Sequence, residues 1–299
     1  MAVLLALVAG LSARGLAAQD HGKAQVELAP ASLAAIEEGR GLIPQGGEFL
    51  LYRWDVFPSV LVFDLSSFVV QDRMFSRLAF FLEKRGYRGR LLTDAQLAGK
   101  HGWNAHDYGA EGLASFFSKA AASGFRLDAE ELALRDIALR EGIVVRSGPA
   151  FAPGAGAVLS ICRSSSKYER ILLLAHESYH GIFFCSSDYR DLCESAWAAA
   201  PEAERSFVSR LLAALGYDET AHELAVNEYQ AYLLQQPAAS LPAYFERVSK
   251  LLSDDPNAPD ISQVLPGLER DEAELQRFLE SRYSISAGGQ AAARAAGGG

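Results

Sequence analysis

The segment SKYERILLLAHESYHGIFFC, at positions 166–185, predicts a long buried helix that carries a metal-binding motif. Its start has the pattern of a capping box, because Ser166 and Glu169 lie three residues apart and can satisfy the first free backbone amides. The run Ile171–Ala175 has no polar side, which is typical of a helix that is buried on most of its faces. We expect this helix to continue to Phe184 or Cys185.

Residues 176–180 read His-Glu-Ser-Tyr-His, a complete H-E-x-x-H motif. Because positions i and i+4 share one face of a helix, His176 and His180 can bind the same metal ion. Glu177 lies beside them, where it can take a proton from a water that zinc activates. The alternative is two ordinary histidines without a metal. Burying them with a carboxylate and no partner would be costly, which favours one zinc ion as the cofactor.

A catalytic zinc ion needs a third protein ligand, because such sites have three protein ligands and a water. The metzincin pattern is excluded, since Phe183 and Ser186 stand where it requires Gly and His. The best candidate is Glu228, which falls within the apolar stripe of a helix that we expect to begin near Asp218 or Thr220. A carboxylate on a buried face is rarely unpaired. The alternative role for Glu228 is a buried ion pair.

Other acids compete for the third position. Two of them, Glu202 and Glu204, follow Pro201 and are already explained by their favourable interaction with a helix dipole. The others lie just past the motif helix and could instead accept the second ring N–H of a ligand histidine. These are Asp188, Asp191 and Glu194.

The H-E-x-x-H of residues 176–180, followed by Asn-Glu-x-x-Ala at residues 227–231, resembles the gluzincin metallopeptidases. Their third zinc ligand is a Glu on a second helix. The resemblance covers about residues 155–235 and concerns the motifs rather than one named family. The chain departs from the thermolysin-like branch, which has an Asp four residues after the ligand Glu, where this chain has Tyr232.

The resemblance implies that His176, His180 and Glu228 bind zinc and that Glu177 is the general base in hydrolysis of a peptide bond. In such peptidases the strand before the metal helix commonly holds the extended substrate by backbone pairing. The segment Ala157–Cys162 stands in that place. We therefore expect substrate contacts from this strand. The side chains expected to contact the substrate or the transition state are Ser160, His106, Tyr229 and Tyr232.

The segment 101–108 gathers two histidines and a tryptophan in an expected loop. It could line the cleft and offer His106 as a donor to the oxyanion. The alternative is a helix N-terminus, with Asp107 near the cap and His106 packed under Trp103. Tyr179 is a further rival as oxyanion donor.

Composition agrees with a folded, exported enzyme, and the resemblance implies a peptide or protein substrate. Hydrophobic residues make up 49% of the 299 residues, enough to bury a large core. The net charge of −9 argues against a nucleic-acid partner or an anionic membrane surface. Two other functions stay open: a non-catalytic binding protein that the metal stabilises, and a hydrolase of a non-peptide amide in the cell envelope. The intact Glu177 argues against the first, because a structural zinc site needs no base.

Residues 1–18 predict a signal peptide, because an apolar run is followed by a small-residue exit. The alternatives are a short membrane anchor and a buried helix. We expect an exported protein, periplasmic or secreted, with no stable membrane span after cleavage. In that oxidising compartment Cys185 and Cys193 could form a disulfide, whereas Cys162 is expected to be a buried apolar residue.

The pattern of segments predicts an α+β fold: a mainly helical, zincin-like metallopeptidase domain with a small mixed sheet in its N-terminal half. The domain is expected over residues 19–286, with an α/β part at 48–150 and a zinc-site helical part at 151–283. The Ala/Gly-rich tail 287–299 is expected to be disordered. Expected strands are 49–54, 60–65, 91–92, 143–145 and 157–162; expected helices include 68–85, 107–121, 128–141, 240–252 and 267–282.

Overall fold

The computed structural model describes residues 28–39, 41–44 and 47–288. The predicted signal peptide and nearly all of the predicted disordered tail therefore lie outside the described residues. The strands are β1 (Ala29–Ala31), β2 (Phe49–Trp54), β3 (Val60–Leu65), β4 (Ala105–Gly109), β5 (Val144–Ser147), β6 (Ala150–Pro153) and β7 (Ala157–Cys162). The helices are α1 (Leu33–Glu37), α2 (Phe68–Gln71), α3 (Arg77–Leu82), α4 (Asp94–Leu97), α5 (Ala110–Ser123), α6 (Ala129–Arg140), α7 (Lys167–Cys185), α8 (Ser187–Ala199), α9 (Glu202–Leu215), α10 (His222–Leu234), α11 (Leu241–Val248) and α12 (Ile261–Tyr283).

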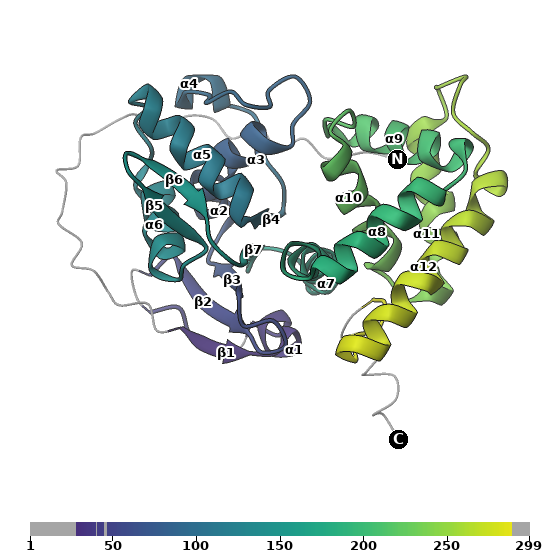
Figure 1. Cartoon of the computed structure of the whole chain (residues 1–299), viewed down its shortest axis with the longest axis horizontal. Coiled ribbons are helices and arrows are strands. Elements are labelled where there is room, and N and C mark those ends of the chain that lie inside the picture. Colours follow the sequence, from purple (N-terminus) through teal and green to yellow (C-terminus); the bar gives the residue numbers. More distant parts are fainter. Residues whose placement is uncertain (1–27, 40, 45–46, 289–299) are drawn as a thin grey trace.

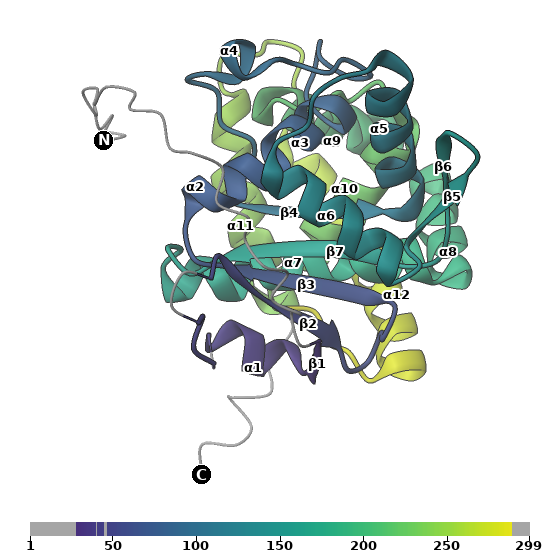
Figure 2. The same ribbon diagram turned by 90° about the vertical axis from the view of Figure 1, so that its left-hand side faces the viewer.

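The elements form two groups on either side of α7 (Figure 1). The sheet lies on one side together with α2, α3, α5 and α6, with α4 at the periphery, and α8 to α12 lie on the other (Figure 1). Seen from the sheet side, α7 runs behind the central strands (Figure 2). This arrangement confirms the expected α+β class, with a small mixed sheet built largely from the N-terminal half.

Five strands form the main sheet in the order β1-β2-β3-β7-β4. β3 and β7 are parallel, whereas β4 is antiparallel to β7 and pairs His106 with Ser160. The central strand β7 comes from the chain just before α7. The predicted parts 48–150 and 151–283 are therefore joined through one sheet.

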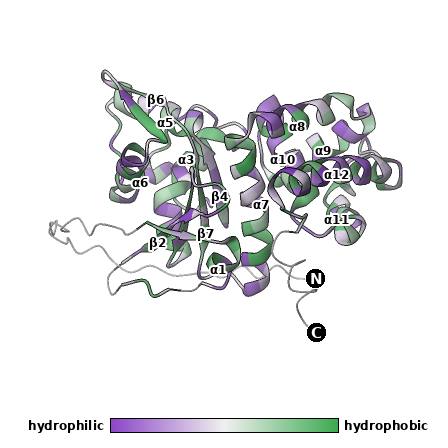
Figure 3. Ribbon diagram, turned by 60° about the horizontal axis from the view of Figure 1, so that its bottom comes forward, coloured by the Kyte–Doolittle hydropathy of each residue, from purple (hydrophilic) through white to green (hydrophobic). Residues whose placement is uncertain are grey.

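Both faces of the central strands are buried, because alternate side chains of a strand point to opposite faces. Val60 and Val62 of β3 belong to the hydrophobic core that α7 and the later helices share. Leu61 and Phe63 belong to a second core under α3, α5 and α6. A strand that is covered on both faces has a continuous apolar sequence, which explains the run 60–63. The colouring in Figure 3 shows hydrophobic residues along α7 and a mixture on the outer helix α12.

The N-terminal end of α7 is fixed by its cap and by a buried ion pair. Ser166 and Glu169 form the predicted capping box. Arg170 contacts Asp64 of β3 at 3.0 Å and also donates to the carbonyl of Cys162. Further along the helix, a Cβ on Gly181 would lie 3.3 Å from Val60, so the missing side chain lets α7 lie close against the sheet.

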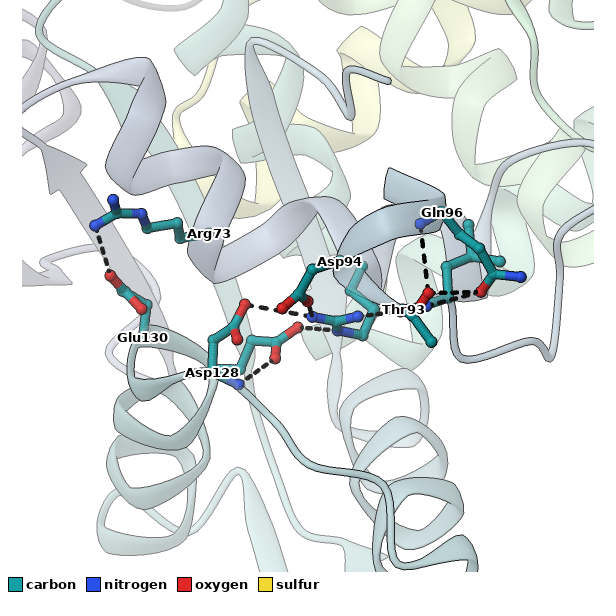
Figure 4. A network of polar contacts seen from close by, with 9 residues as sticks. Arg73, Thr93, Asp94, Gln96, Asp128 and Glu130 are labelled. Carbon is teal, nitrogen blue, oxygen red and sulfur yellow. Dashed lines mark hydrogen bonds and ion pairs between the residues drawn. The ribbon is translucent and has the colours of Figure 1, made fainter. Parts of the chain in front are cut away.

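The predicted helix 68–85 is confirmed as a nearly continuous helical segment, 68–82, with a π-helical turn at 72–76. Arg77 fixes this segment to the start of α6 and to the loop before α4. It donates to Glu131 at 2.7 Å and to Asp94 at 2.7 Å, and it also bonds the carbonyl of Leu92. Figure 4 shows this network, with the more exposed Arg73–Glu130 pair beside it.

Several expected boundaries were wrong for identifiable reasons. Residues 91–92 form no strand, because the Leu92 carbonyl bonds Arg77 rather than a neighbouring strand. Asp107 belongs to β4 rather than to a helix, because it pairs with Leu159. The helix of Glu228 begins at His222, since the Thr220 hydroxyl donates to Asp218 and does not cap it. Helix α12 begins before the expected Gly267, at Ile261.

The expected disulfide is wrong: Cys185 and Cys193 are both free thiols. Cys193 is buried in the core beside α7, while the Cys185 sulfur lies 3.4 Å from the Ser59 hydroxyl, next to β3. Cys162 is buried, as expected. Among the described residues, no helix has both the length and the apolar content to cross a membrane.

Candidate metal centre

The three predicted metal ligands lie together. The Nε2 atoms of His176 and His180 are 3.0 Å apart, and the Oε2 atom of Glu228 lies 3.5 Å from the first and 3.9 Å from the second. Ligands bound tetrahedrally at zinc distances lie about 3.3 Å from one another. Helices α7 and α10 therefore hold three donor atoms at a spacing that fits one zinc ion.

Burial sets the protonation of these groups. His180 is 0% exposed and Glu228 is 2% exposed. Burial lowers the pKa of His176 and of His180 to about 4, so both imidazoles are neutral and can bind a metal. Burial also raises the pKa of Glu228 to about 7, and its Oε2 atom has no hydrogen bond. An orphaned buried carboxylate oxygen facing two neutral imidazoles fits a bound metal ion.

Glu177 is buried next to these ligands, and one of its oxygens has no hydrogen-bond partner. Burial, reinforced by the charge of Glu228, raises its pKa well above the usual value. Asp107 of β4 interacts with Glu177, and its Oδ2 lies 3.6 Å from Nδ1 of His180. Asp107 is thus the carboxylate that faces the second ring nitrogen of a ligand histidine. The acids of α8 do not take this role; Glu194, for example, pairs with the exposed His222.

A cavity of about 270 Å³ opens beside the ligands. Its walls include His176 and Glu177 from α7, Tyr232 from α10, and the segment 103–105 that leads into β4. Two larger surface pockets, beside Arg210 and Arg73, contain none of the three ligands. The cavity next to the ligands is therefore the candidate substrate site.

Two tyrosines reach the ligands from the cavity wall. The Tyr232 ring packs against His176 with 4.8 Å between ring centres, which places this predicted contact residue at the site. Tyr217 was not predicted. Its hydroxyl is a hydrogen-bond partner of both Glu228 and Tyr232. It lies in the turn after α9, where the sequence shows only one aromatic residue beside Gly216.

Three other predicted contact residues are not at the site. Tyr229 points away from it, and its hydroxyl bonds Asp271 at 2.6 Å and also Glu204. His106 and Ser160 bond each other at 3.0 Å and do not line the cavity. Because side chains alternate along β4, Asp107 faces the metal ligands and His106 faces the opposite core. Tyr179, also considered as an oxyanion donor, bonds the Ser286 carbonyl instead.

The substrate-pairing role expected for residues 157–162 is wrong, because β7 is paired on both sides, with β3 and with β4. Among the described residues, β4 and β1 are the two edge strands of this sheet. Ala105 and Asp107 of β4 line the cavity, so the unpaired backbone edge lies next to the metal ligands. An open edge of this kind can accept an extended chain, which a central strand cannot.

Comparison with known proteins gave no match to any family model, curated protein or solved structure.

Proposed function

We propose that the protein is a zinc-dependent hydrolase of amide bonds, with peptides as its substrates and a zincin-like active site. The observation that carries this proposal is the convergence of His176, His180 and Glu228 around one point beside a cavity. A structural zinc site has four protein ligands, whereas three ligands next to an open cavity leave a position for water. The gluzincin resemblance of the two motifs supports the same assignment.

A bound Zn²⁺ would polarise the scissile carbonyl and lower the pKa of its bound water toward about 7. Glu177 is placed to accept the water proton and to pass it to the leaving amine. Its unpartnered oxygen and its position on the cavity wall suit this role. Asp107 would hold the ring of His180 through its Nδ1 atom.

The remaining residues of the site would position the substrate. The free edge of β4 could pair with an extended peptide and bring its backbone past Glu177. Tyr232 and Tyr217 have hydroxyls beside the ligands and could donate to the developing oxyanion. The predicted signal peptide suggests that the enzyme acts after export.

The test is a comparison of the native protein with Glu177→Gln. We expect both to hold one zinc ion per chain, and we expect peptide turnover by the variant to fall by at least about a hundredfold, because the base is lost. Glu223→Gln is a matched control, since Glu223 is exposed on α10. Full activity in Glu177→Gln, or no zinc in the native protein, would contradict the proposal.

A further inference from the structure

Glu83 is a buried carboxylate that the proposed hydrolysis does not use. It directly follows α3, is 6% exposed, and lines the cavity together with Glu177. The indole N–H of Trp103 donates to its Oε2 atom. Within the described part of the chain, the Oε1 atom accepts no hydrogen bond. One oxygen of Glu83 is therefore available to a ligand in the cavity.

Among the described residues, no Lys, Arg or His forms an ion pair with Glu83. The neighbouring Lys84 directs its ammonium group onto the Trp103 ring, 2.8 Å from the ring centre. Arg88 pairs with Asp218 instead, at 3.7 Å. Lys84 and Arg88 thus make no direct ion pair with Glu83, although the charge of each lowers its pKa.

The cavity region holds more carboxyl groups than one metal ion would bind. Glu83, Asp107, Glu177 and Glu228 are close enough to interact electrostatically. Zinc would compensate Glu228, Asp107 faces His180, and Glu177 exchanges a proton during the reaction. Glu83 has no ion-pair partner of its own among the described residues, and burial raises its pKa to about 8.

The walls next to Glu83 suit an organic cation. Trp103 and Tyr217 stack with 4.4 Å between ring centres, and both line the cavity. Tyr217 covers one face of Trp103 and the Lys84 ammonium the other, so the methylene stem of a basic side chain would pack along the edges of the two stacked rings, while its charged end meets the carboxylate. A guanidinium or ammonium group would form a charge-assisted hydrogen bond with Oε1.

We propose that Glu83, Trp103 and Tyr217 form a subsite for a positively charged group of the substrate, next to the scissile amide. This inference rests on the proposed function, because the cavity is a substrate subsite only if the metal centre acts on a bound chain. The cation is an ammonium or guanidinium group, from either a basic side chain or a free α-amine.

The test is calorimetric binding of matched probes to the zinc-loaded protein. N-acetyl-arginine methylamide and N-acetyl-citrulline methylamide have nearly the same shape and differ in charge. Alanine methylamide and lactic acid methylamide, in which a hydroxyl replaces the α-amine, test the α-amine in the same way. We expect the charged member of at least one pair to bind at least about tenfold more tightly. The pair that discriminates identifies the source of the cation, and equal binding within both pairs overturns the proposal.

Glu83→Gln should abolish this discrimination, whereas Glu223→Gln should retain it. Discrimination that survives in Glu83→Gln overturns the assignment to Glu83. If that variant does not fold, the probe pairs on the native protein still decide whether a cation subsite exists. The preference should persist in about 1 M NaCl, where the Debye length of about 3 Å screens the general attraction to an acidic surface. A preference that disappears in salt overturns the subsite.

Peptide turnover, measured separately, reports on the proposed function. Binding that does not discriminate charge, in a protein that hydrolyses peptides, contradicts the subsite alone. Charge-selective binding without turnover by the zinc-loaded protein contradicts the hydrolase proposal and leaves the cation site in place.

Discussion

The Oε2 atom of Glu228 lies 3.5 Å from the Nε2 atom of His176, although two complete helices, α8 and α9, separate these residues along the chain. Both groups are buried, and that oxygen has no hydrogen bond. Burying a carboxylate beside two imidazoles costs free energy, and a bound metal ion would offset that cost.

Replacing Glu228 by Gln should remove most of the zinc affinity without unfolding the chain, since the two side chains have the same shape. Mutating a residue that only supports a metal ligand already lowers the metal affinity about 10–100-fold, so we expect the loss of a ligand to lower the zinc affinity by more than about a hundredfold. Zinc content after dialysis against a weak chelator measures it. The matched control is Glu223→Gln on the same helix, which should keep its zinc. Equal zinc retention in both variants would refute Glu228 as a ligand.

The metal-free protein should lose stability as the pH rises from about 6.5 to 8. Burial raises the pKa of Glu83 to about 8 and that of Glu228 to about 7, from 4.5. The folded state therefore keeps protons that the unfolded state has released, and rising pH favours unfolding. The two groups together give a loss of about 2 kcal/mol in the free energy of unfolding.

The buried histidines act in the opposite direction. The pKa of each falls from 6.5 to about 4, so their contribution is lost as the pH falls below about 6.5. Zinc should reverse the trend above that pH, because metal binding favours the deprotonated ligands. Urea unfolding at both pH values, with and without zinc, measures the effect. A metal-free protein that is more stable at the higher pH would show that these carboxyls are not protonated in the fold.

Tyr232→Phe should lower kcat and leave the zinc content unchanged. Its hydroxyl is proposed to donate to the oxyanion, and the loss of one such donor costs about 10²–10³ in kcat. The ring that packs against His176 remains in the variant, so a change in kcat reports the loss of the hydroxyl rather than of the packing. Tyr217→Phe is the companion measurement; if neither variant slows turnover, the oxyanion donor lies elsewhere.

Arg77→Met should destabilise the fold by about 3–5 kcal/mol, because it leaves the buried Glu131 without its partner. Arg73→Gln, in the same helical segment, breaks an ion pair whose arginine is 57% exposed and should change stability by less than about 1 kcal/mol. Urea unfolding of both variants provides the comparison. The network matters to the site because α3 ends directly before Glu83. Similar stabilities for the two variants would mean that the buried network contributes little.

Local signals in the sequence were enough for much of the fold. The strands 49–54 and 60–65 have their predicted bounds, because a short continuous apolar run bounded by turn residues is typical of a buried strand. The capping box at Ser166 was predicted correctly because its two residues lie three positions apart. Prediction failed at Asp107 and Thr220, where a cross-strand pairing and a side-chain contact in a turn override the local pattern.

The sequence alone determined that His176, Glu177 and His180 lie within two turns of one buried helix, because helical periodicity places i and i+4 together. It also singled out Glu228 as a buried acid. Tertiary structure decided which groups surround them: Asp107 rather than an acid of α8, Tyr217 and Tyr232 rather than Tyr229, and the edge strand β4 rather than β7. Such choices depend on which face of each element packs against α7, and that is set by contacts between distant segments rather than by local sequence.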